Sequence, residues 1–436
     1  MTSLPRFERN LPGILEDLYV GPSPDYRDDL LAVARRTRQR PAWSFPERWI
    51  PMDTANRLAF APRYPVRLLA VGLLILALVA AGLIWYAGTH PAIKPAVPFG
   101  PAGNGAIVYA LGGDIYVGDP GSGTSHRIST SAEFDRNPFV SPDGTHVAFL
   151  RTAADSTADS FDLVVADIDG SNARTISTSK VSDGDPAVWS PDSTFLLMMN
   201  SGENLYRYNV DGSAPVLVAR RAMARAFLPP DGRQLVYEEL DPAQRSLGIM
   251  NADGTDRHII YTIPTEDWQD GCDYGSVLVS PGGKSIAFER KPHGTGAQCR
   301  VFLMNLDGTG AHQLAADTDY LYETDLQFSP DGATIAFNRW NSSKVAGQWL
   351  VEPIGVVSVN GGATRSIGPT PVGDGAAFQW SPDGKSIVST PATVVQWPPS
   401  KTMPEAHPVI IDVATGAWHE APWTMSSWPT WQRVGR

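Results

Sequence analysis

The sequence has 436 residues, of which 42% are hydrophobic and 19% are charged. That balance is typical of a folded globular chain and argues against disorder along its whole length. The formal net charge of −11 argues against a protein that binds nucleic acid over its whole surface. Charge is unevenly placed, because residues 1–67 hold 11 Arg and 8 acidic residues and carry +3, which leaves −14 for the remainder.

Residues 1–67 are predicted to form a small N-terminal segment with one helix. Leu30 to Ala34 supply apolar side chains, and Ser23 or Asp25 can cap the start of the helix. Acidic residues come early in this stretch and arginines late, which suits the helix dipole. The segment either docks a cytoplasmic protein partner or lies on a membrane surface through its arginines and tryptophans.

Residues 68–87 read LLAVGLLILALVAAGLIWYA, twenty residues without a charged side chain. About 20 such residues allow a helix to cross a bilayer core, and Trp85 and Tyr86 stand where interfacial aromatic residues are found. Arginines concentrate before this segment, so the positive-inside rule predicts a single-pass protein of the cell membrane with a cytoplasmic N-terminus. Residues 88–104 are rich in Pro and Gly and are predicted to be a semi-extended linker to an extracytoplasmic domain at 105–436.

A turn followed by a strand recurs six times after the linker, at steps of 49, 39, 51, 49 and 52 residues. Pro sets the backbone of the second turn residue, Asp favours the third, and Gly accepts a positive φ. The six copies are SPDGTHVAF from Ser141, SPDSTFLLM from Ser190, PPDGRQLVY from Pro229, SPGGKSIAF from Ser280, SPDGATIAF from Ser329 and SPDGKSIVS from Ser381.

Each copy predicts a unit of four antiparallel strands, which is the blade of a β-propeller. A short apolar run precedes the turn, and two more strands follow, joined by a second turn of the Asp-Gly type, as in DLVVADIDG at 162–170. Three strands from Ala106 and one strand near 427–432 complete a further blade. The predicted fold is therefore an all-β propeller with seven blades, closed by its C-terminal strand, with six blades as the alternative.

The pattern of this repeat resembles the TolB-like, tricorn-type β-propeller repeat. The resemblance covers about residues 105–432, and six-fold recurrence makes it specific for the fold. It implies a propeller scaffold and says little about activity, since propellers carry many functions.

No motif in the sequence predicts an enzyme, a metal site or a cofactor. The DIDG stretch at 167–170 resembles a calcium loop, but Val165 and Ile176 stand where the first and last ligands would be. The eight histidines lack metal-binding spacing, and neither a nucleophile elbow nor a phosphate-binding loop occurs. We therefore expect a chain that binds rather than catalyses.

Binding is predicted on the propeller face opposite the Ser-Pro-Asp-Gly turns, where the loops are longer and more varied. Aromatic and acidic side chains alternate in these loops, which suits a protein, peptide, glycan or cationic ligand. A structural alternative is that the aromatic side chains pack between blades. The candidates are Trp268, Tyr274, Tyr320, Tyr322, Trp340, Trp349, Trp397, Glu266, Asp267, Asp270 and Asp319.

Cys272 and Cys299 are the only cysteines and are predicted to form a disulfide. Both fall on the loop face of the fifth blade, and an extracytoplasmic domain lies in an oxidising compartment. First and third strands lie about 10 Å apart, beyond the reach of a disulfide, so the glycine-containing loops must lean together.

Three functional hypotheses follow from the sequence. The first is a membrane-anchored, extracytoplasmic propeller that binds a ligand or a protein. The second is a transmembrane regulator with the propeller as sensor, similar in layout to membrane anti-sigma factors, although their zinc motif is missing since residues 1–67 contain no cysteine. The third is a cryptic hydrolase.

Overall fold

The computed structural model describes residues 71–81, 95–153, 160–181, 187–241, 244–263, 276–291, 299–315, 322–342, 349–370, 377–390 and 405–436. The chain divides into two compact units, residues 1–91 and residues 92–436. In the first unit a helix spans 71–81. Among the described residues, no helix has the length and apolarity needed to cross a membrane. The remainder of the predicted 68–87 span and the helix expected near Leu30 lie outside the described residues.

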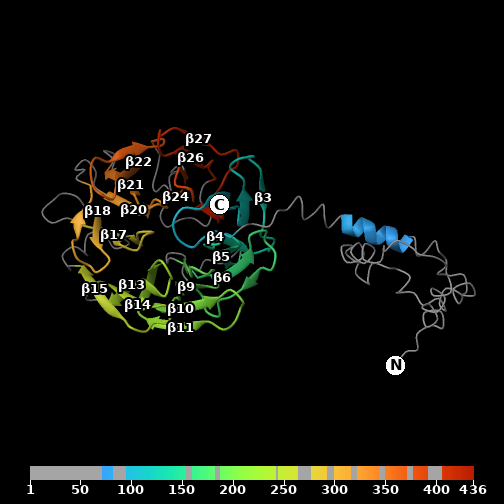
Figure 1. The fold of residues 1–436 in the computed structure, drawn as a ribbon, viewed down its shortest axis with the longest axis horizontal. Coiled ribbons are helices and arrows are strands. Elements are labelled where there is room, and N and C mark those ends of the chain that lie inside the picture. Colours follow the sequence, from blue (N-terminus) through green and yellow to red (C-terminus); the bar gives the residue numbers. More distant parts are fainter. Residues whose placement is uncertain are drawn as a thin grey trace, which may run out of the picture. The chain divides into compact units, whose positions relative to one another are not determined.

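The second unit is built from seven four-stranded antiparallel sheets arranged as the blades of a ring (Figure 1). From the innermost strand outward, the first four blades are β28 (Thr430–Val434), β1 (Gly103–Leu111), β2 (Asp114–Gly118) and β3 (Ser125–Arg127); β4 (Phe134–Val140), β5 (His146–Thr152), β6 (Asp162–Asp167) and β7 (Arg174–Thr175); β8 (Val188–Trp189), β9 (Phe195–Met199), β10 (Asn204–Asn209) and β11 (Val216–Arg220); β12 (Ala222–Phe227), β13 (Gln234–Asp241), β14 (Gln244–Asn251) and β15 (His258–Ile263). The last three are β16 (Val277–Val279), β17 (Ser285–Arg290), β18 (Arg300–Asn305) and β19 (His312–Gln313); β20 (Tyr322–Phe328), β21 (Thr334–Ser342), β22 (Trp349–Ser358) and β23 (Arg365–Ile367); β24 (Phe378–Trp380), β25 (Ser386–Ser389), β26 (Val409–Asp412) and β27 (Trp418–Glu420). The predicted seven blades are confirmed, and the six-bladed alternative is wrong.

The last strand closes the ring. β28 pairs antiparallel with β1, with Ile107 opposite Trp431 and Val108 opposite Thr430. The Trp431 indole is buried and donates a hydrogen bond to the Gly105 carbonyl, 3.1 Å away. Both edges of the first blade's inner hairpin are thus paired, which removes the exposed edge that an open array would leave.

Seven apolar clusters, one between each pair of neighbouring blades, form the core. Successive side chains of a strand point to opposite faces of its sheet. One face of each sheet therefore packs against the preceding blade and the other face against the following blade. The cluster between the last and first blades contains Tyr109, Trp423 and Trp431, and the Tyr109 and Trp423 rings stack 6.1 Å apart. Because each sheet is covered on both faces, the strands read as nearly continuous apolar runs.

The recurring turn also joins neighbouring blades. In four copies the buried Ser side chain donates to the Asp carboxylate two residues later at 2.6–2.7 Å and fixes the turn locally. The turn glycine has a positive φ, and a Cβ at Gly232, Gly283, Gly332 or Gly384 would lie 2.3–3.5 Å from a proline of the preceding blade's turn. The turn therefore recurs because it shapes each hairpin and also packs against the next copy.

The third blade departs from this pattern and compensates with a hydrogen bond. Ser193 occupies the glycine position with φ of 60°. Its Oγ accepts the backbone N–H of Asp143 from the preceding blade, 3.2 Å away. A side-chain contact thus replaces the close backbone approach.

Part of the predicted linker is bound to the propeller rather than extended away from it. The Arg433 side chain donates from Nη2 to the carbonyls of Val97 and Gly100, at 2.9 and 2.8 Å. Ala96 donates its N–H to the Asp143 carbonyl, and Phe99 packs on the cluster between the third and fourth blades. Residues 95–102 therefore lie along the Ser-Pro-Asp-Gly turns, near the centre of the ring (Figure 1). We call this segment the strap.

Candidate functional site

The propeller has two faces. We call the face at which the second strand of each blade connects to the third the loop face, and the predicted site lies there. The opposite turn face carries the Ser-Pro-Asp-Gly and Asp-Gly turns. Eight of the candidate residues lie outside the described residues: Trp268, Tyr274, Tyr320, Trp397, Glu266, Asp267, Asp270 and Asp319. Their predicted role in binding stays a prediction.

The three described candidates all belong to the sixth blade, at its loop-face end. Tyr322 on β20 lies directly opposite Trp340 on β21, and both are half-buried. The Trp340 indole N–H donates to Thr324 Oγ1, 2.9 Å away, which fixes the ring against the inner strand. Trp349 begins β22 opposite Ser342. The structure thus brings Tyr322 and Trp340 together as a cross-strand aromatic pair.

Next to this pair, two carboxylates approach each other between the fifth and sixth blades. Glu289 on β17 is 8% exposed, and its Oε1 accepts the backbone N–H of Asp325 on β20 at 2.9 Å. Burial first, and then the negative charge of Asp325, raise the pKa of Glu289 to about 8. The Asp325 carboxylate accepts hydrogen bonds from Asn338 and Thr324, at 3.0 and 3.1 Å. Burial also raises the pKa of Asp325, so this pair of carboxyl groups holds a proton more tightly than two separate exposed groups would.

Cys299, at the start of the fifth blade's third strand, is buried and disulfide-bonded. The sequence contains one other cysteine, Cys272, which lies outside the described residues. The described residues contain no group of three or more His, Cys, Asp and Glu side chains that could hold a metal ion.

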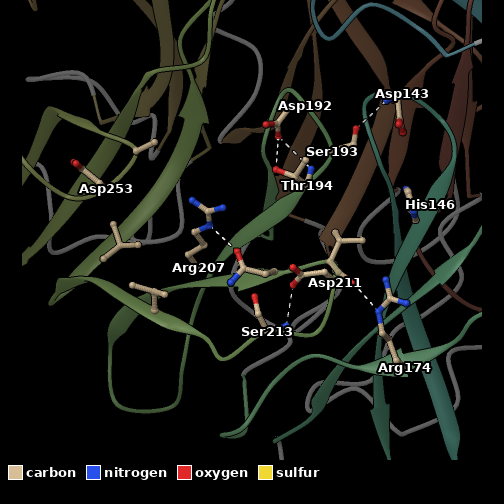
Figure 2. A pocket seen from close by; sticks show the side chains of 15 residues that line it. Asp143, His146, Arg174, Asp192, Ser193, Thr194, Arg207, Asp211, Ser213 and Asp253 are labelled. Carbon is tan, nitrogen blue, oxygen red and sulfur yellow. Dashed lines mark hydrogen bonds between the residues drawn. The ribbon is translucent and has the colours of Figure 1, made fainter.

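The turn face carries a cavity that sequence reasoning missed. Its volume is about 710 Å³, and it lies between the second, third and fourth blades (Figure 2). Turn residues and outer-strand residues of the three blades line it. They are Asp143, His146, Arg174, Asp192, Ser193, Thr194, Arg207, Asn209, Val210, Asp211, Ser213, Val216, Val218, Ala252 and Asp253.

The aspartates of the cavity keep their negative charge because their turns stabilise it. The backbone N–H of Ser213 lowers the pKa of Asp211, and Thr255 lowers that of Asp253 through its hydroxyl and its N–H. Burial raises the pKa of Asp192, but hydrogen bonds from Ser190 and Thr194 outweigh it, so the pKa is lowered overall. The cavity therefore presents carboxylates that stay ionised at neutral pH.

Two arginines from neighbouring blades supply the opposite charge. Arg174 on β7 donates from Nε to the Val210 carbonyl of the next blade, 2.6 Å away. Arg207 on β10 donates from Nε to Asn209 Oδ1 at 2.7 Å, and its Cζ lies 3.9 Å above the centre of the Phe195 ring. Both guanidinium groups are thus held by Nε, as Figure 2 shows.

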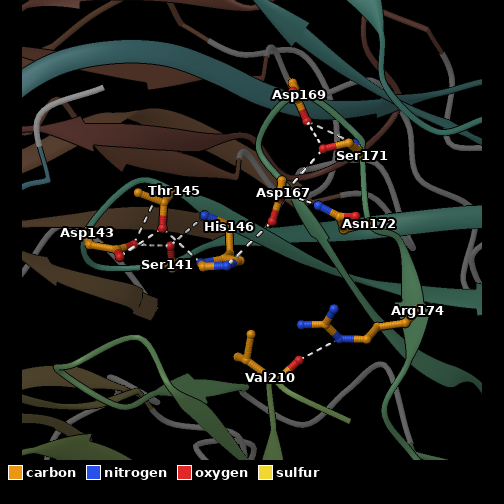
Figure 3. A network of polar contacts seen from close by, with 10 residues as sticks. All are labelled: Ser141, Asp143, Thr145, His146, Asp167, Asp169, Ser171, Asn172, Arg174 and Val210. Atoms are coloured by element: carbon orange, nitrogen blue, oxygen red, sulfur yellow. Dashed lines mark hydrogen bonds and ion pairs between the residues drawn. The ribbon is translucent and has the colours of Figure 1, made fainter. Parts of the chain in front are cut away.

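His146 connects the two turns of the second blade at the edge of the cavity (Figure 3). Its Nδ1 lies 2.8 Å from Thr145 Oγ1, and its Nε2 lies 3.6 Å from Asp167 Oδ1. Asn172 donates to the same Asp167 carboxylate at 2.7 Å. This network fixes the turn whose Asp143 carbonyl binds the strap.

Comparison with known proteins supports the fold. No family model matches the chain, and no curated protein matches it. A solved prolyl endopeptidase structure has a TM-score of 0.51 at 13% identity, over 76% of this chain and 50% of that one. TolB from Acinetobacter baumannii has a TM-score of 0.45 at 13% identity, over 74% of this chain and 81% of that one. An oligogalacturonate lyase in complex with manganese has a TM-score of 0.47 at 16% identity, over 74% of this chain and 85% of that one.

At these identities the similarity shows the fold alone. The chain is a seven-bladed β-propeller, as the repeat predicts, and the similarity to the prolyl endopeptidase structure at a TM-score of 0.51 agrees with that fold.

Proposed function

We propose that this chain is a binding propeller, anchored to a membrane by residues 68–87 and displayed on the extracytoplasmic side. The observation that carries the proposal is the strap. Because Arg433 holds Val97 and Gly100, the chain enters the propeller on the turn face. The loop face, on the other side of the ring, carries no part of the strap and is the surface that we propose for a protein or peptide partner.

The aromatic pair of Tyr322 and Trp340 supports binding at the loop face. Half-buried aromatic side chains offer a rigid apolar surface with polar atoms at the rim, which is what protein interfaces use as anchors. Trp340 is already fixed by its bond to Thr324, so ordering it on binding costs little entropy. We propose binding, without catalysis, as the activity of this face.

The membrane part of the proposal is tested by protease accessibility. One epitope tag is placed before Met1 and another after Arg436, and protease is added to sealed cells freed of any wall. We expect loss of the C-terminal tag and protection of the N-terminal tag, because arginines concentrate before residue 68. A protected C-terminal tag in sealed cells that is digested after lysis would contradict the proposed topology.

A transmembrane regulator is the second candidate function. The hydrogen bond from Ala96 to Asp143 favours it, because one turn both holds the strap and lines the cavity. A ligand in that cavity would thus contact the element that binds the connection to residues 1–67. Capture of a cytoplasmic partner by residues 1–67 would separate this function from simple anchoring.

A further inference from the structure

The cavity between the second, third and fourth blades has hydrogen-bonding atoms that face inward. Arg174 and Arg207 donate through Nε to the residues that the structure describes around them, which leaves their terminal nitrogens available to a ligand. Asp211 and Asp253 accept their turn hydrogen bonds through Oδ1. Their Oδ2 atoms remain available for donors from a ligand.

Positive and negative charge are distributed unevenly across the cavity. Arg174 and Arg207 both act on the pKa of Asp211, and Arg207 also acts on that of Asp192, so these four charges partly balance. Asp253, at the fourth-blade end, accepts hydrogen bonds from Thr255 and forms no ion pair with an arginine among the described residues. Figure 2 shows Asp253 and Arg174 at opposite sides of the cavity, with Arg207 between them.

An apolar wall completes the cavity. Val216, Val218 and Ala252 line it, and Val216 is 53% exposed. A volume of about 710 Å³ falls in the range of pockets that bury small organic ligands. The cavity therefore offers a carboxylate at one end, a guanidinium group with available terminal nitrogens at the other end, and an apolar side.

We propose that this cavity binds a short peptide with free termini, its ammonium group at Asp253 and its carboxylate at Arg174. A guanidinium group binds a carboxylate through parallel hydrogen bonds, and a carboxylate binds an ammonium group through charge-assisted ones. A neutral sugar would leave the excess charge of Asp253 uncompensated, whereas an ammonium group neutralises it. Val216 and its neighbours would contact the peptide's side chains.

This site lies on the turn face, opposite the surface assigned to the partner, so either proposal can fail without the other. The test is isothermal titration of the full-length chain with trialanine, N-acetyl-trialanine and trialanine amide. We expect trialanine to bind, and blocking either terminus to weaken binding about tenfold or more, because each removes a charge-assisted hydrogen bond.

Two variants assign the termini. In Asp253→Asn, trialanine and N-acetyl-trialanine should bind equally, because the partner of the ammonium group is gone. In Arg174→Gln, trialanine and trialanine amide should bind equally. Both side chains are exposed, and Asn can still accept the hydrogen bonds from Thr255, so both variants should fold.

The chain offers a matched control for each variant outside the cavity. Asp307 binds Thr309 in the fifth blade at the same distances, 3.0 and 2.6 Å, that Asp253 has to Thr255. Arg365 donates from Nη2 to the Val413 carbonyl of the next blade, whereas Arg174 donates from Nε to the corresponding Val210 carbonyl. Asp307→Asn and Arg365→Gln should bind all three peptides as the unmodified chain does.

Several results would overturn the proposal. Failure of trialanine to bind at millimolar concentration would reject the proposal. Equal binding of the three peptides would also reject it. An unchanged preference in both cavity variants would show that the peptide binds elsewhere. If glucuronate bound and trialanine did not, the ligand of the cavity would be an acidic sugar and the peptide proposal would be wrong.

Discussion

Replacement of Gly144 by alanine is expected to destabilise the propeller by more than about 3 kcal/mol. A Cβ at this position would lie 1.9 Å from the Arg433 carbonyl oxygen on the closing strand. No rotation of a side chain relieves that contact, because the obstacle is backbone. β28 would have to move away from the second blade, and the strap held by Arg433 would move with it.

Gly384 provides the matched control for Gly144. It occupies the same turn position in the seventh blade, with φ of 76° against 77°. Its added Cβ would lie 3.5 Å from Pro330, an ordinary contact, so alanine should cost only the strain of a left-handed residue, about 1–2 kcal/mol. Urea unfolding followed by tryptophan fluorescence measures both variants. Equal losses would show that the closing strand does not pack as described.

Glu289→Gln is expected to change how stability depends on pH. The pKa of Glu289 is raised to about 8, so the folded protein holds this proton more tightly than the unfolded chain does. The resulting stability is fully present below the unfolded pKa and is lost as pH rises through about 8. Relative to Glu289→Gln, the unmodified protein should therefore lose roughly 4 kcal/mol between about pH 5 and about pH 9.

The comparison uses urea unfolding at several pH values across that interval. Gln keeps an oxygen that can accept the Asp325 N–H, so the substitution removes the ionisation and leaves that hydrogen bond. Glu420→Gln on the exposed outer strand β27 is the control, because it makes the same chemical change at an exposed side chain. Parallel pH curves for Glu289→Gln and the unmodified protein would contradict the raised pKa.

The fold could be predicted because its signals are local and repeated. The Ser-Pro-Asp-Gly turn specifies a hairpin through the backbone preferences of its own residues, and the buried strands of each blade are short apolar runs. Counting strands at both ends of the repeat array gave the closing strand, which the structure places at Thr430–Val434. The turn recurs so closely because each copy also packs on its neighbour, as Gly232 does on Pro191.

The strap could not be predicted, because its partners are remote in sequence. A Pro- and Gly-rich stretch predicts an extended chain wherever it lies. Whether it is free or bound depends here on Arg433, more than 300 residues away, and on the turn that contains Asp143. Composition carries no information about such contacts.

The cavity was missed for a different reason. Asp211 and Asp253 each have a complete local explanation as turn residues, so neither draws attention in the sequence. Only the stacking of three blades places them near Arg174 and Arg207. The loop-face prediction rested on loop length and aromatic content, which identified the pair of Tyr322 and Trp340 but no charged cavity on the turn face.

The most direct test of the proposed function is photo-crosslinking in living cells at one residue of each face. A benzophenone side chain replaces Tyr322 on the loop face or the exposed Lys385 on the turn face of the seventh blade. We predict a discrete protein adduct from position 322 and none from position 385, because the proposal assigns the partner to the loop face. An adduct from position 385 alone, or none from position 322, would contradict a binding propeller that presents its loop face.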